Sequence, residues 1–157
     1  MIKLVDVRPE HKELLWNIHQ KYLYEMTKFY PDEMDKAGNY HYGYFDSYFT
    51  DPERNALLIY HDSVLIGFAV INPYSYIDAD PDYVLAELTI FPAYRKNHFA
   101  YDAAECIFRK YKGHWEIKFN ENNIAAKNLW NKVTSAYSPT VHCYSDCETV
   151  LSFYIQD

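Results

Sequence analysis

Residues 87–100 limit what this chain can fold into more than any other stretch. The first part is an apolar run that predicts a buried strand ending at Pro92. A short loop with two cations, Arg95 and Lys96, follows, and then an amphipathic helix. A loop of this kind directs free backbone N–H groups and a helix N-terminus at whatever lies in front of it. That arrangement favours anions, and phosphates above all.

Length and charge exclude several classes of protein. The 157 residues are enough for one domain with a real core, and we expect a single domain over residues 1–157. A formal charge of −7 argues against a nucleic-acid surface. The chain has no apolar run long enough for a membrane span, no signal-peptide pattern and only three cysteines. We therefore expect a soluble cytoplasmic protein with no membrane partner, either a monomer or a homodimer.

Apolar periodicity predicts a mixed α+β fold. Strands are expected at residues 2–7, 55–60, 64–71, 83–91, 115–119, 141–144 and 150–155. Helices are expected from Pro9 to Met26, at 44–49, from Ala100 to Tyr111 with Gly113 as a C-cap, and at 124–133. This order fits a mostly antiparallel sheet of about seven strands with one βαβ crossover in its middle. About four helices would cover it, giving three layers.

Three segments carry a resemblance to a known family. The strand, loop and helix from Glu87 to Tyr111 are the first, and Asn-Ile-Ala-Ala-Lys-Asn-Leu-Trp at 123–130 is the second. Gly67, in an aliphatic run after a hairpin, is the third. Together they resemble the GNAT superfamily of N-acetyltransferases, whose phosphate loop reads (Gln/Arg)-x-x-Gly-x-(Gly/Ala). Here the loop is Arg95–Ala100, with His98 at the place of the central glycine.

The resemblance implies that the loop holds the pyrophosphate of acetyl-CoA, with no metal. Backbone N–H groups of the loop would bind the phosphates; the residues concerned are Lys96, Asn97, His98, Phe99 and Ala100. The side chains of Arg95 and Lys96 would add positive charge, unless they form only a solvated surface pair. His98 either accepts the left-handed conformation and donates to a phosphate, or marks a remodelled loop.

The resemblance also implies catalytic roles on the central strand. Glu87 stands where many family members carry a glutamate that acts through water as general base. The alternative is an ordinary polar residue on a strand face. The backbone of Ile90 would contact the oxyanion and the pantetheine arm.

Two further positions have open interpretations. Asn123 either approaches the pantetheine arm or caps the helix that follows it. Trp130 stands where the family usually has a tyrosine whose hydroxyl lies near the thioester sulfur. Indole can only donate a hydrogen bond, so Trp130 either contacts the cofactor in that way or packs against Leu129 and Val133. Tyr137 is another tyrosine nearby in the sequence.

We expect direct transfer of acetyl from acetyl-CoA to an amine of a small molecule or peptide, with no covalent enzyme intermediate. One alternative is a degenerate member that binds an acyl-CoA, a nucleotide or a partner protein without turnover. A second is an aromatic-rich interaction module, suggested by the run from Tyr40 to Phe45.

Acidic segments at 32–35 and 78–82 favour a cationic acceptor, with Tyr40, Tyr42 and Tyr44 as a possible wall. The alternative is that these loops are merely solvated. The group His142, Cys143 and Cys147 lacks a fourth ligand nearby, so we expect no metal site.

Overall fold

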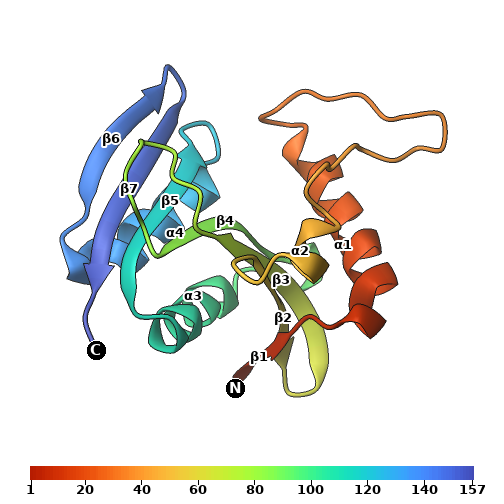
Figure 1. The fold of residues 1–157 in the computed structure, drawn as a ribbon, viewed down its shortest axis with the longest axis horizontal. Coiled ribbons are helices and arrows are strands. Elements are labelled where there is room, and N and C mark those ends of the chain that lie inside the picture. The colour runs from red at the N-terminus through yellow and green to blue at the C-terminus, as the bar shows by residue number, and fades with distance from the viewer.

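The structure, a computed structural model that describes all 157 residues, is built on one seven-stranded sheet with helices on both faces (Figure 1). The strand order is β1-β2-β3-β4-β5-β7-β6, and every pair is antiparallel except β4 with β5. The strands are β1 (Ile2–Asp6), β2 (Asn55–His61), β3 (Val64–Asn72), β4 (Tyr83–Ile90), β5 (Gly113–Asn120), β6 (Thr140–Ser145) and β7 (Glu148–Ile155). The α-helices are α1 (Lys12–Met26), α2 (Ser47–Thr50), α3 (Phe99–Lys110) and α4 (Ile124–Thr134). Short 3₁₀ turns are η1 (Pro9–His11), η2 (Pro92–Tyr94) and η3 (Ser135–Tyr137).

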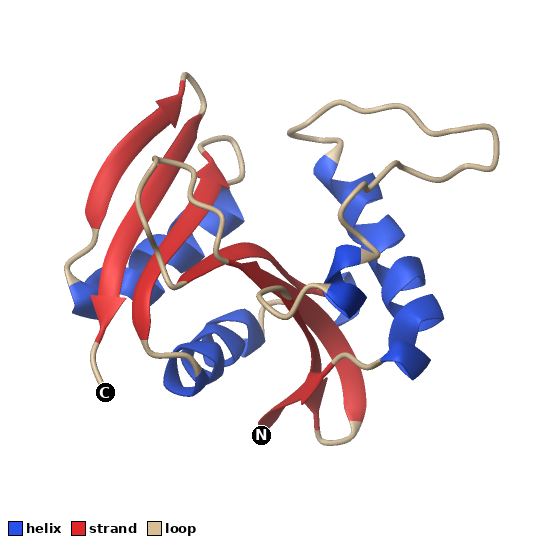
Figure 2. Ribbon diagram, in the orientation of Figure 1, coloured by secondary structure: helices blue, strands red, loops and turns tan.

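Alternation along the strands separates the two helical layers. In β2, Leu57 and Ile59 belong to the apolar cluster under α3 and α4, whereas Ala56 and Leu58 belong to the cluster under α1 and α2. Figure 2 shows α1 and α2 beside the strands of the amino-terminal half, and α4 behind β5 and β7. The α+β class, the seven strands, the four helices and the α3 crossover between parallel strands are confirmed.

The sheet divides where β4 leaves β5. The two strands pair only through residues 83–85 and 115–117. Immediately beyond that ladder the register with β3 shifts, because Val70 pairs with Glu87 while Ile71 pairs with Leu85. Ala86 is therefore the extra residue of a β-bulge, and a bulge bends a strand and increases its twist. Figure 1 shows the result as two arms, β1–β4 on one side and β5–β7 on the other.

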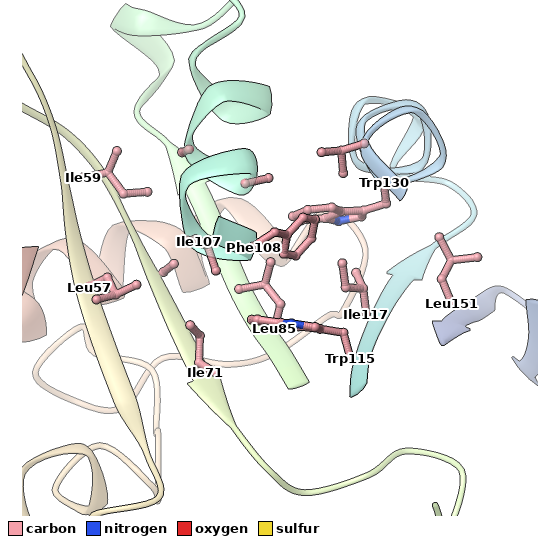
Figure 3. Close-up of a cluster of buried hydrophobic side chains, with 14 of the residues drawn as sticks. Leu57, Ile59, Ile71, Leu85, Ile107, Phe108, Trp115, Ile117, Trp130 and Leu151 are labelled. Atoms are coloured by element: carbon pink, nitrogen blue, oxygen red, sulfur yellow. The ribbon is translucent and has the colours of Figure 1, made fainter. Parts of the chain in front are cut away.

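The larger core lies between the sheet and the helices α3 and α4. Trp115 and Phe108 are almost completely buried there, with ring centroids 5.2 Å apart. Figure 3 shows the indole of Trp130 reaching from α4 toward Phe108 on α3, above Ile117 of β5. Each such side chain contributes roughly 1.5–3 kcal/mol on burial, so this core fixes α3 and α4 against the sheet.

Two local expectations were wrong. Gly113 does not cap α3, because Tyr111 holds that position and Gly113 begins β5 with φ +136°. A side chain at Gly113 would overlap the Asp82 carboxylate, which accepts a hydrogen bond from the backbone N–H of His114. The second wrong expectation is the helix at 44–49, since α2 begins only at Ser47. Tyr44 therefore lies before the helix, where it is 60% exposed and its ring contacts the guanidinium of Arg54.

No helix of this chain combines the length and the apolar character that crossing a membrane requires.

Candidate active site

A cleft of about 1170 Å³ opens where β4 and β5 separate. Its walls are the end of α1 with the loop after it, β4, the start of α3, the end of β5 and α4. The residues that the resemblance assigns to the cofactor and catalytic site all line this one cleft except Asn97; they are Glu87, Ile90, Arg95, Lys96, His98, Phe99, Ala100, Asn123 and Trp130. Segments that are far apart in the sequence therefore converge on a single site.

Backbone donors of β4 point into the cleft. The N–H of Phe91 donates to the carbonyl of Ile66 on β3 at 2.7 Å. Backbone donors alternate sides along an antiparallel strand. The N–H groups of Leu88 and Ile90 therefore point away from β3, toward the edge of β4 that is not paired with β5. The Ile90 carbonyl on that edge accepts from Nε of Arg95 at 2.7 Å. The split thus exposes two backbone donors at the floor of the cleft.

The loop between η2 and α3 has the shape of an anion site. Lys96 and His98 adopt left-handed conformations, with φ of 64° and 65°, on either side of Asn97. Alternation of this kind can turn successive N–H groups toward one point. His98 is the N-cap of α3 and makes no side-chain cap hydrogen bond, so the first N–H groups of α3 have no capping side chain. Histidine therefore takes the conformation that the family's glycine favours.

Asn97 shapes this loop from outside the cleft. Its side-chain amide donates to the carbonyl oxygens of Tyr94 and Arg95, at 3.3 and 3.2 Å. The side chain is thus used within the loop, and only the backbone of Asn97 is left to contact a ligand.

Arg95 is engaged within the protein. Its guanidinium donates to both carboxylate oxygens of Glu25 at 2.6 and 2.7 Å, which ties the end of α1 to the loop. The hydrogen bond from Arg95 holds the pKa of Glu25 below its usual range. Arg95 lines the cleft while it is held by Glu25, and its contribution of positive charge near the phosphates stays a prediction. Lys96, by contrast, forms no salt bridge and keeps its charge available to the cleft.

Glu87 has a buried partner that sequence reasoning missed. Nε2 of His19, on α1, lies 2.7 Å from Oε2 of Glu87, and the His19 side chain is only 1% exposed. A signal was present in the sequence, since His19 lies four residues after Leu15 on the buried stripe of α1. What the sequence could not give is the pairing with a strand 68 residues away.

Both interpretations of Asn123 have support. Its Oδ1 accepts from the N–H of Ala126 at 3.2 Å, as an N-cap should, and the residue also lines the cleft. Trp130 is 6% exposed and belongs mainly to the core, with one part at the cleft wall. Tyr137 does not line the cleft, because its ring stacks on Phe153.

Aromatic side chains do line the cleft, but they are not those expected for the acceptor wall. Tyr40, Tyr42 and Tyr44 lie outside the cleft wall, which is formed instead by Tyr22, Phe29, Tyr30 and Tyr76. Burial is the largest cause that raises the pKa of Tyr22 and of Tyr76, and the charge of Glu87 adds to it. These phenols therefore stay neutral and can donate hydrogen bonds.

The acidic segments are only partly at the site. Asp32 lines the cleft. Asp35 accepts hydrogen bonds from backbone N–H groups of its own loop, and Asp82 accepts one from the backbone N–H of His114. No three His, Cys, Asp or Glu side chains are grouped as a metal site would require.

Comparison with known proteins agrees with this geometry. The family model described as "Acetyltransferase (GNAT) family" matches residues 13–134, most of the chain. The chain therefore belongs to the GNAT family of acetyltransferases, and so to the acyltransferase enzymes, as the sequence predicts. No curated protein sequence matches the chain.

Solved structures show the same fold over the whole length. An acetyltransferase from Thermus thermophilus has a TM-score of 0.70 at 15% identity, covering 99% of this chain and 97% of that one. The spermidine N-acetyltransferase of Vibrio cholerae, solved with CoA and spermine, gives 0.64 at 12% identity, covering 98% and 94%. The diaminobutyrate acetyltransferase of Paenibacillus lautus, solved with its substrate L-2,4-diaminobutyric acid and coenzyme A, gives 0.65 at 10%, covering 100% and 98%. Identities this low establish the fold alone.

Proposed function

We propose that the protein transfers the acetyl group of acetyl-CoA directly to an amine of a small molecule or peptide. The observation that carries this proposal is the split between β4 and β5. Because of this split, the N–H groups of Leu88 and Ile90 face the cleft, and the N-terminus of α3, which has no capping side chain, lines the same cleft. A thioester and a pyrophosphate need these two kinds of donor within one continuous site.

The residues present suit acetyl-CoA. The first turn of α3 and the loop residues Lys96 to Ala100 would hold the pyrophosphate, with the Lys96 side chain supplying charge. The pantetheine arm would lie along the open edge of β4, near Asn123 and Trp130. Pockets for drug-sized ligands measure roughly 300–1000 Å³, so a cleft of about 1170 Å³ has room for a long cofactor and an acceptor.

The chemistry needs few protein groups. The neutral amine nitrogen bonds to the thioester carbon, and the carbonyl electrons move to oxygen, where the Ile90 N–H can stabilise the charge. Glu87 accepts the proton that the amine gives up, directly or through water. The carbon–sulfur bond then breaks, leaving an amide and a thiolate. The thiolate takes its proton from water or from a cleft tyrosine, because the indole N–H of Trp130 can donate a hydrogen bond but is not acidic enough to transfer its proton.

A cationic amine suits the acceptor side best. The carboxylates of Glu87 and Asp32 line the cleft, and so do the aromatic rings of Tyr22, Tyr30 and Tyr76. Aromatic faces and carboxylates both favour an ammonium group. The amines bound by two structural neighbours, spermine and diaminobutyric acid, support the same class.

The test is release of the CoA thiol from acetyl-CoA, followed with a thiol reagent over a panel of cationic, neutral and anionic amines. We expect turnover with cationic primary amines and none with anionic ones. Turnover limited to neutral or anionic acceptors would overturn the acceptor class. Tight acetyl-CoA binding without turnover on any amine would instead support the non-catalytic binder.

A further inference from the structure

We propose that His19 is the positioning residue for Glu87, an inference that rests on the proposed acetyl transfer. The imidazole Nε2–H donates to Oε2 of Glu87 at 2.7 Å and holds the carboxylate at the floor of the cleft. Oε1 of Glu87 has no hydrogen-bond partner in the protein, and it is not among the buried unpaired atoms. That second oxygen therefore remains accessible from the cleft to accept the acceptor's proton.

The surroundings of His19 fix its tautomer. A carboxylate only accepts hydrogen bonds, so the nitrogen that faces Glu87 must carry the hydrogen. Nδ1 of His19 is buried and has no partner, so in the neutral ring it is an unprotonated acceptor. A hydrogen on Nδ1 would be a buried N–H donor without an acceptor, which is unfavourable. The geometry thus places an Nε2–H donor of His19 against one carboxylate oxygen of Glu87.

Packing holds the imidazole in this orientation. Its ring lies 4.2 Å from that of Tyr42 and 5.7 Å from that of Phe68, measured between centroids, with Tyr22 at 6.0 Å. A ring enclosed on several sides cannot turn away from Glu87 without moving its neighbours. The hydrogen-bond donor is therefore preorganised before either substrate enters.

No other group takes over this role. The titratable groups that sense the charge of Glu87 are Tyr22 on α1, Tyr42 on the loop before α2, and Tyr76 between β3 and β4. Burial is the first cause of the raised pKa of each, so all three stay neutral. No lysine or arginine pairs with Glu87, and His19 is the only side chain that hydrogen-bonds to it. Loss of His19 thus leaves the carboxylate without a fixed position.

The first experiment is a double-mutant cycle on wild type, His19→Phe, Glu87→Gln and the double variant. Phenylalanine keeps the aromatic packing and removes the donor. We expect His19→Phe to lower kcat/KM for the amine about tenfold or more through misplacement of the base. Its affinity for acetyl-CoA should stay within about twofold, because His19 lies outside the cleft lining. In the Glu87→Gln background the same change should have no further effect. An equal loss in both backgrounds, or no loss in either, overturns the inference.

His19→Gln is the matched control, because the glutamine amide can place a donor near the position of Nε2. It should recover a substantial part of the activity that His19→Phe loses, and it carries the test if His19→Phe does not fold. Activity of His19→Gln no higher than that of His19→Phe would contradict a role for the donor.

A second readout needs no turnover. Long-range ¹H–¹⁵N spectra of the full chain labelled in its histidine rings should show His19 as the Nε2–H tautomer in wild type, assigned by its loss in His19→Phe. A ring whose Nε2 carries no hydrogen, the Nδ1–H tautomer, would refute the inference. If wild type acetylates no amine, the proposed function fails, and the spectrum still decides whether the pair is organised as described.

Discussion

The contact between Arg95 and Glu25 gives a quantitative prediction that separates a structural role from direct phosphate binding. The pair joins the end of α1 to the loop that precedes α3 through two hydrogen bonds of 2.6 and 2.7 Å. The two side chains are 39% and 21% exposed, so solvent screens part of the interaction. Exposed ion pairs contribute about 0.2–1 kcal/mol, and bidentate geometry places this pair at about 1 kcal/mol after that discount.

Urea unfolding of wild type, Arg95→Ala, Glu25→Ala and the double variant measures this coupling free energy. We expect about 1 kcal/mol at neutral pH. Because the pKa of Glu25 is lowered in the folded protein, its contribution is present above the ordinary carboxyl value of 4.5. It is lost as the pH falls through the lower folded value. The coupling should therefore shrink as the pH falls below 4.5. A coupling indistinguishable from zero at neutral pH would refute the reasoning.

Acetyl-CoA binding adds a second comparison on the same variants. If Arg95 acts by holding the loop, Arg95→Ala and Glu25→Ala should weaken acetyl-CoA binding to a similar extent. If Arg95 instead contacts the phosphates, only Arg95→Ala should weaken it, and Glu25→Ala should leave it unchanged or tighter.

Three further predictions concern single positions. Gly67→Ala should destabilise the fold by about 2 kcal/mol or more in chemical unfolding, since its Cβ would overlap the backbone carbonyl of Thr89; an unchanged midpoint would contradict the close β3–β4 approach. Trp130→Ala should cost about 3–5 kcal/mol by the same measurement, because the indole fills the space between α3 and α4; a loss below about 1 kcal/mol would place it outside the core. Glu87→Gln should lower kcat/KM about tenfold or more at neutral pH and regain activity at high pH, where the amine is already neutral; full activity at neutral pH would remove Glu87 from the mechanism.

Local pattern was sufficient to predict the sheet and its helices. Alternation and helical periodicity are properties of neighbouring residues, and they gave each strand of the split sheet to within a few residues. Gly113 shows the limit of such rules. A glycine after a helix usually marks a C-cap, but this one starts β5, where the Asp82 carboxylate leaves no room for a side chain.

The candidate site was predictable where it depends on the backbone. A loop that joins the end of a strand to the start of a helix must lie beside both. The position of the loop from Lys96 to Ala100 at the cleft therefore follows from the order of the elements alone. The partners of charged side chains could not be predicted in this way. Glu25 for Arg95 and His19 for Glu87 come from α1, about 70 residues earlier in the chain, and only the packing of α1 on the sheet brings them together.

The central claim, that the cleft at the split between β4 and β5 binds acetyl-CoA, is tested most directly by calorimetric titration of three proteins. These are wild type, Ala100→Trp and Ala93→Trp. Ala100 lines the cleft in the first turn of α3, where a large side chain would block the approach of the pyrophosphate to the backbone. Ala93 is exposed in η2 and lies outside the cleft lining, so it serves as the matched control. We predict saturable binding to wild type and Ala93→Trp, and none to a folded Ala100→Trp. Absence of binding to wild type at millimolar acetyl-CoA, or equal binding to all three proteins, would contradict the claim.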